Sequence, residues 1–100
     1  MAAGRGEFQE VEFGGNQLLV LDGRVVEYFK RDQPPTAGGW RWHVRHLAVE
    51  AKPRRDGGLS IHLGRERHGR VWAQATAEVP PQDVPTVLRF FEAAKRESAT

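Results

Sequence analysis

Apolar and polar residues alternate along most of the chain, which is the pattern of β-strands that bury one face. Short breaks containing glycine, proline or aspartate separate the alternating runs, as expected for turns between antiparallel strands. The runs predict seven strands, over Phe8–Phe13, Gln17–Leu21, Arg24–Lys30, Trp40–Val44, Leu47–Lys52, Leu59–Leu63 and Arg70–Val79. Strands that follow one another in this way, before any helix, indicate an antiparallel β fold.

The pattern changes its period after two consecutive prolines, Pro80 and Pro81, which cannot donate hydrogen bonds to a sheet. We expect a helix over Asp83–Glu97, with Asp83 as its N-cap, because the apolar residues now recur at helical spacing. The stripe consists of Val84, Val87, Leu88, Phe91 and Ala94, widened by Phe90. A single apolar stripe must be buried against the preceding strands, and we expect Phe91 to lie at its centre.

The clearest turn signal is Asp22-Gly23, which separates two strongly apolar runs. With these two residues as the loop, a type I′ hairpin places Leu21 opposite Arg24. Both faces of the hairpin carry apolar side chains, so we expect a curled sheet that is covered on both sides. One face holds Leu19, Leu21, Val26 and Tyr28, and the other holds Leu18, Val20 and Val25.

A wider resemblance covers nearly the whole chain and is carried by the segments VEFGGNQLLVL, RWHVRHLAVEAKP, GGLSIHLG and PQDVPTVLRFFEAAKR. Their succession is similar to the pleckstrin-homology-like (PH-like) barrel, and above all to small bacterial members of that superfold, many of them actinobacterial. The resemblance implies a mainly β fold, an open barrel of seven antiparallel strands capped by the C-terminal helix. It also implies one domain over residues 7–98, which follows a tail, residues 1–6, that we expect to be disordered.

The lipid-binding PH-like proteins hold an inositol phosphate with basic residues along the first strands and the loop between them. Here the first turn, Gly14-Gly15-Asn16, contains no cation, and the Asp22-Gly23 turn has only Arg24 beside it. The resemblance therefore does not extend to phosphoinositide binding. The superfold hosts many unrelated binding roles and does not select one.

Composition and charge exclude few classes of function. The chain has 15 basic and 13 acidic residues, and its net charge of +2 does not demand a nucleic-acid partner. The preference for arginine over lysine is typical of a G+C-rich genome. The chain has no cysteine, no apolar run that would span a membrane and no secretion signal at its start, so we expect a cytoplasmic protein.

Two basic groups flank the predicted strand Leu59–Leu63. The first consists of Lys52, Arg54 and Arg55, and the second of Arg65, Arg67, His68 and Arg70. Because they lie at opposite ends of that strand, they cannot form one site. Arg65, Arg67 and Arg70 are the candidates for contact with an anion or a nucleic acid. The alternative is that these are solvated turn residues, which also discourage aggregation of strand edges.

The residues that serve catalysis or metal binding elsewhere do not assemble into a site in this pattern. On an extended strand His43 and His46 would lie on opposite faces, where they cannot share a metal ion. Only the change of phase expected near Arg45-His46 could bring them together, and no acidic or thiolate neighbour completes a ligand set. Ser60 and His62 share a face, but side chains so placed stand too far apart for a nucleophile and its base. We therefore expect no enzyme activity, no metal and no cofactor.

The three tryptophans favour contacts with proteins. Trp40 and Trp42 are expected in the core, whereas Trp72 has the parity opposite to the small residues of its strand and is the candidate for an exposed anchor. Tyr28, on the face of the hairpin that also holds Leu19, Leu21 and Val26, is expected to join Trp72. The chain is thus predicted to be a non-catalytic binding or assembly module, acting through a protein partner or self-association as a homodimer. The alternative is weak binding of nucleic acid or anions through the arginine-rich turns.

Overall fold

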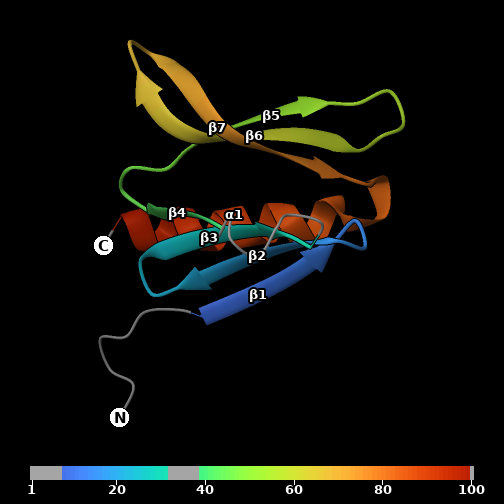
Figure 1. Ribbon diagram of the computed structural model, residues 1–100, viewed down its shortest axis with the longest axis horizontal. Coiled ribbons are helices and arrows are strands. Elements are labelled where there is room, and N and C mark those ends of the chain that lie inside the picture. Colours follow the sequence, from blue (N-terminus) through green and yellow to red (C-terminus); the bar gives the residue numbers. More distant parts are fainter. Residues whose placement is uncertain (1–7, 32–38, 100) are drawn as a thin grey trace.

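A computed structural model of the protein describes residues 8–31 and 39–99 (Figure 1). Four strands form one antiparallel sheet, in the order β1 (Phe8–Phe13), β2 (Gln17–Asp22), β3 (Val25–Lys30) and β4 (Trp40–His43). Three more form a second antiparallel sheet, in the order β5 (Ala48–Pro53), β6 (Leu59–Arg67) and β7 (Arg70–Val79). A 3₁₀ turn over Pro81–Asp83 leads into the helix α1 (Val84–Ser98).

The mainly β class predicted from the sequence is confirmed, because residues 8–31 and 39–99 form seven antiparallel strands and one C-terminal helix. Within the described residues the strands form two separate sheets, and no strand pairing closes them into a barrel. In the view of Figure 1, α1 overlaps β3 and β4 and lies below the three-stranded sheet. The predicted tail, residues 1–6, and residues 32–38 of the predicted loop between Lys30 and Gly39 lie outside the described residues.

The core lies between the two sheets and α1. Its fully buried side chains come from the β2–β3 hairpin, from β6 and β7 and from the helix, and include Leu19, Leu21, Val26, Tyr28, Ile61, Leu63, Val79, Val87 and Phe90. Alternation explains this set, because successive side chains of a strand point to opposite faces of its sheet. In β1, for example, Val11 and Phe13 are buried, while Glu10 and Glu12 are exposed.

The β2–β3 hairpin differs from the prediction by one residue in each strand. Leu21 pairs with Val26, so the two-residue loop consists of Gly23 and Arg24 instead of Asp22 and Gly23. Gly23 has a φ of 62°, and it occupies the first central position, where a type II′ turn requires glycine. Each residue of β2 therefore pairs with a residue two positions further along β3 than predicted. A change of two positions keeps every side chain on its predicted face of the sheet.

Tyr28 is a core residue and not a surface residue. Its side chain has no exposed area, and its hydroxyl donates a hydrogen bond of 2.6 Å to Oε1 of Gln17, the one buried polar residue described. The Gln17 amide in turn donates to the carbonyl oxygen of Glu78 on β7. The prediction that Tyr28 forms part of an interface is therefore wrong, because its side chain is buried between the two sheets and a partner cannot reach it.

The helix buries a face slightly rotated from the predicted one. Phe90 has no exposed area and lies at the centre, while Phe91 is half-buried beside it with its ring perpendicular to that of Phe90. Leu88 is 42% exposed. The expectation that Phe91 is the central side chain is therefore wrong. The buried stripe is Val87, Phe90, Ala93 and Ala94.

Replacing Phe90 by alanine should lower the free energy of unfolding by about 3 to 5 kcal/mol, because it empties the centre of the core. Phe91→Ala is the matched control and should cost clearly less, since part of that ring already contacts solvent. Urea denaturation followed by circular dichroism measures both values. Equal losses for the two variants would show that the helix buries a different face.

Replacing Tyr28 by phenylalanine should lower the free energy of unfolding by about 1 to 3 kcal/mol, because Oε1 of Gln17 then loses the donor that satisfies it in a buried place. The ring volume is retained, so the far-ultraviolet circular dichroism, which reports the backbone, should not change. A variant as stable as the original would mean that water replaces the hydroxyl at no cost.

Candidate functional site

The β6–β7 hairpin continues well beyond the body of its sheet. β5 begins at Ala48, which pairs with Gly64, so among the described strands the residues of β6 after Gly64 pair only with β7. Residues Arg65–Trp72 therefore form a two-stranded ribbon, which we call the arm. Figure 1 shows the arm bending away from the rest of the molecule at the upper left. The sequence did not predict it, because the expected strand ended at Leu63.

A β-bulge lies at the root of the arm. Leu63 pairs with Ala75, whereas Gly64 pairs with Ala73, so Gln74 is an extra residue on β7. A bulge bends a strand and shifts the phase of its side chains. Glycine is required at position 64, because a Cβ there would collide with the carbonyl oxygen of Trp72.

The tip of the arm is a tight turn. His68 has a φ of 55° and Gly69 a φ of 78°, which are the two left-handed residues that a type I′ turn requires. His68 is the one non-glycine residue of the described chain with such a backbone. This turn fixes the register of the ribbon, with Arg67 opposite Arg70 and Arg65 opposite Trp72.

This register gathers the predicted anion contacts and the predicted aromatic anchor on one surface. Residues opposite each other in an antiparallel pair share a face, as do residues two apart. One face of the arm, the Arg/Trp face, therefore carries Arg65, Arg67, Arg70 and Trp72. All four are exposed, Trp72 at 58%. From the sequence alone, the three arginines and Trp72 were two separate candidate sites.

The phase shift at the bulge explains why Trp72 lies there. Without the bulge, Trp72 would have the parity opposite to Ala75 and would point away from the core side of the sheet. With Gln74 as an extra residue, Trp72 shares the face of Arg65 and of Leu63. The exposure predicted for Trp72 is confirmed, but its cause is that the arm projects beyond the core.

The Arg/Trp face is partly ordered in advance. The guanidinium carbon of Arg67 lies 4.7 Å from the centre of the Trp72 ring, a cation–π contact. The acidic residue of the arm, Glu66, pairs with Val71 and lies on the other face. The Arg/Trp face therefore offers three guanidinium groups, which bind carboxylates or phosphates in pairs of hydrogen bonds, beside one broad apolar ring.

A hydrogen bond from Trp42 holds the root of the arm to the four-stranded sheet. The indole nitrogen of Trp42 donates a hydrogen bond of 2.6 Å to Oε1 of Gln74, the bulge residue. Trp42 is 4% exposed, as predicted for a core residue. Trp40 is half-buried and stacks on Tyr28, with ring centres 5.5 Å apart.

The other basic group lies at the opposite end of β6, as predicted, in the β5–β6 turn at the right of Figure 1. Arg54 forms ion pairs there with Asp56 at 3.1 Å and Glu78 at 3.5 Å. These contacts hold the turn together. The position of the turn confirms that the group cannot act together with the Arg/Trp face.

His43 and His46 do not lie on opposite faces of one strand, because the change of phase expected near Arg45-His46 is present as a turn. A turn after β4 brings the rings of His43 and His46 within 5.8 Å of each other, because the chain is not extended between them. The described residues contain no group of three potential metal ligands, so this pair lacks the additional ligands of a metal site.

Ser60 and His62 each contact β7 and not each other. The Ser60 hydroxyl donates to Glu78 at 2.7 Å, and Nδ1 of His62 lies 3.2 Å from the hydroxyl of Thr76. These cross-strand contacts fix the sheet, as expected for paired polar side chains. Ser60 and His62 are therefore not paired with each other as a nucleophile and its base.

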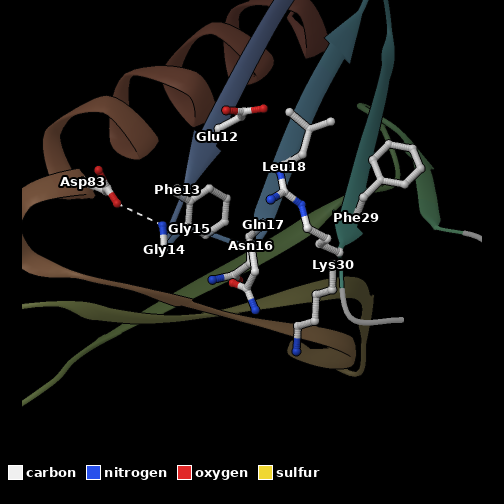
Figure 2. Close-up of a pocket in the computed structure, with 11 residues that line it drawn as sticks. Glu12, Phe13, Gly14, Gly15, Asn16, Gln17, Leu18, Phe29, Lys30 and Asp83 are labelled. Carbon is white, nitrogen blue, oxygen red and sulfur yellow. Dashed lines mark hydrogen bonds between the residues drawn. The ribbon is translucent and has the colours of Figure 1, made fainter. Parts of the chain in front are cut away.

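A hollow of about 470 Å³ lies at the β1–β2 turn (Figure 2). Glu12, Leu18 and Phe29 pair across the strands and point to one side of the sheet, whereas Lys30 points to the other. The hollow thus wraps around the end of the sheet, and its polar groups do not converge on a common point. Such an arrangement does not favour a small-molecule site.

Asp83 lines the same hollow and does not act as predicted. Its side chain caps no helix nitrogen, and Oδ2 instead accepts a hydrogen bond of 3.0 Å from the backbone nitrogen of Gly14 (Figure 2). The N-cap prediction is therefore wrong in its chemistry, although Asp83 immediately precedes α1. This contact ties the start of the helix to the β1–β2 turn.

No family model matches the chain, and neither a curated protein nor a solved structure matches it. Across residues 8–31 and 39–99, no helix has the length and apolar character needed to cross a membrane. The Arg/Trp face is the surface of the described chain on which Arg65, Arg67, Arg70 and Trp72, the predicted site residues other than Tyr28, come together.

Replacing Gly64 by alanine should destabilise the protein by about 1 to 3 kcal/mol and displace the arm, because the added Cβ meets backbone and cannot be relieved by a side-chain rotation. Gly69→Ala is the matched control: it has open space around it and suffers only from its positive φ, at a cost of about 1 kcal/mol. Urea denaturation gives the stabilities, and amide chemical shifts of residues 65–72 report the arm. Unchanged shifts in Gly64→Ala would contradict the bulge.

Proposed function

We propose that this protein is a non-catalytic binding module of the PH-like type, and that the Arg/Trp face of its arm binds an acidic segment of a partner protein. The observation that carries the proposal is the assembly of Arg65, Arg67, Arg70 and Trp72 on one exposed face. A tryptophan this exposed has an energetic cost in water, and its retention beside three cations is best explained by a partner that covers it.

The PH-like assignment is supported by the order and number of the elements. Two antiparallel sheets of four and three strands precede one C-terminal helix, and the helix buries its apolar face in the shared core. The resemblance of the sequence to small bacterial PH-like proteins implies the same arrangement. We further propose a cytoplasmic location, which the absence of cysteine fits.

A protein partner is favoured by the residue types on the arm. Tryptophan and arginine are the residues most enriched where binding energy concentrates in protein interfaces, whereas lysine is depleted there and is absent from the arm. The stacking of Arg67 on Trp72 also restricts both side chains before binding, so less conformational entropy is lost on association.

The partner should be acidic, because the charges of the Arg/Trp face are all positive. Carboxylates accept paired hydrogen bonds from guanidinium groups, and apolar side chains next to them would cover the Trp72 ring. Single-stranded nucleic acid offers phosphates and bases to the same groups. The protein partner is preferred because Arg67 already occupies one face of the ring on which a base would stack.

The experiment compares two labelled probes by fluorescence anisotropy, a glutamate-rich peptide with interspersed leucines and an oligothymidylate of equal charge. The peptide should bind more tightly. Trp72→Ala and Arg67→Glu should each weaken peptide binding about tenfold or more, the range of residues at the centre of an interface. Arg55→Glu, at the opposite end of β6, is the matched control and should change the affinity little.

Two outcomes would contradict the proposal. Tighter binding of the oligothymidylate, with a strong dependence on salt, would show that the arm is a nucleic-acid contact. Equal affinities for the Trp72, Arg67 and Arg55 variants would show that the peptide binds elsewhere. Circular dichroism of each variant establishes that the fold is retained.

A further inference from the structure

Among the described strands, β5 lies at an edge of the three-stranded sheet, and the backbone groups on its outer side can be identified. The nitrogen of Arg54 donates to the carbonyl oxygen of Gly58, which makes these two residues a hydrogen-bonded pair of the β5–β6 ladder. Such pairs alternate along an antiparallel ladder. The backbone groups of Ala48, Glu50 and Lys52 therefore point toward β6, and those of Val49 and Ala51 point away from the sheet.

The side of this edge that faces the core is also uncovered. Val49 pairs with the fully buried Leu63, yet Val49 is 39% exposed. A groove of about 260 Å³ separates the start of β5 from the last turns of α1, and Val49, Phe91 and Lys95 are among its lining residues. An exposed strand edge beside apolar surface is a template for another strand.

We propose that β5 pairs with β5 of a second copy of the chain, in antiparallel orientation about a two-fold axis at Ala51. The two three-stranded sheets then become one six-stranded sheet. The Ala51 residues of the two copies exchange both of their backbone hydrogen bonds. The nitrogen of Val49 in each copy meets the carbonyl oxygen of Pro53 in the other.

Charge complementarity selects this register. With Ala51 opposite Ala51, Glu50 of each copy lies opposite Lys52 of the other, so two ion pairs form on the outer face. Moving the two-fold axis to position 50 places two glutamates opposite each other, and moving it to position 52 places two lysines opposite each other. Like charges directly opposite each other are unfavourable, so only the axis at Ala51 gives attraction at both positions.

Pro53 fits the same register. It lacks a backbone N–H, and its position in the alternation directs that missing donor away from β6, where proline is tolerated in an edge strand. The proposed pairing requires only its carbonyl oxygen. A two-fold interface of this kind also uses the same edge of both copies, so the assembly closes as a dimer and does not grow into a fibre.

Sedimentation velocity of the full chain over a range of concentrations tests the proposal. The original protein should form a dimer, while Glu50→Lys and Lys52→Glu, examined separately, should each raise the dissociation constant about tenfold or more by opposing like charges. Mixing these two variants should restore a dimer, because one copy then carries lysine at both positions and the other carries glutamate at both. The double variant should also dimerise.

Hydrogen exchange supplies a second measurement. The amides of Val49 and Ala51 should exchange slowly in the dimer and quickly at dilutions where it dissociates, whereas those of Glu50 and Lys52 should change much less because they bond to β6. A monomer at millimolar concentration would overturn the proposal, as would a dimer that the charge variants do not weaken. None of these residues belongs to the Arg/Trp face, so each outcome is independent of peptide binding by the arm.

Discussion

Side chains of the four-stranded sheet reach across to β7 and hold the two sheets in one alignment. The contacts join Gln17 to the carbonyl oxygen of Glu78, Tyr28 to Gln17 and to the carbonyl oxygen of Thr76, and Trp42 to the side chain of Gln74. Three successive strands thus meet alternate residues of β7. Apolar packing tolerates small slips, but a slip of one residue here would leave several buried polar groups unpaired, which is costly. Among the described residues every buried side-chain nitrogen and oxygen has a partner.

This alignment also determines where the two proposed binding surfaces lie. Because Gln74 is both the bulge residue and the acceptor for Trp42, the contact that joins the sheets also fixes the direction in which the arm leaves the body. At the other end of β7, the Asp83–Gly14 contact fixes the entry into α1. The helix in turn leaves the β5 edge uncovered. The arm and the open edge are therefore consequences of how β7 is held.

The strands and the helix could be predicted from the sequence, because each depends on the periodicity of its own residues. Features that depend on contact with another strand or with the helix could not be predicted in this way. The loop of the β2–β3 hairpin moved by one residue because Asp22-Gly23 and Gly23-Arg24 are both acceptable turns, and pairing with the neighbouring strands decides between them. The buried aromatic of the helix is Phe90 because the direction of the apolar stripe is set by the sheet that it meets.

The candidate site shows the same division. Arg65, Arg67, Arg70 and Trp72 could be selected by residue type, but their meeting depends on a bulge at Gly64, which no alternating pattern reveals. Tyr28 was misplaced because an aromatic residue on an apolar face is compatible with either a core or an interface. Its hydroxyl contact with Gln17 involves another strand and becomes visible only in three dimensions.

The bulge separates the residues that form the core from the arm, whose side chains are mostly exposed. Beyond it, all but one residue of the ribbon is exposed, so substitutions at most of its positions remove little buried area. Relatives of this chain could therefore exchange the residues of the ribbon for a different set while the body retained its stability. If the arm binds a partner as proposed, differences in binding specificity among relatives would lie mainly in this short hairpin, while the sequence of the body would change slowly.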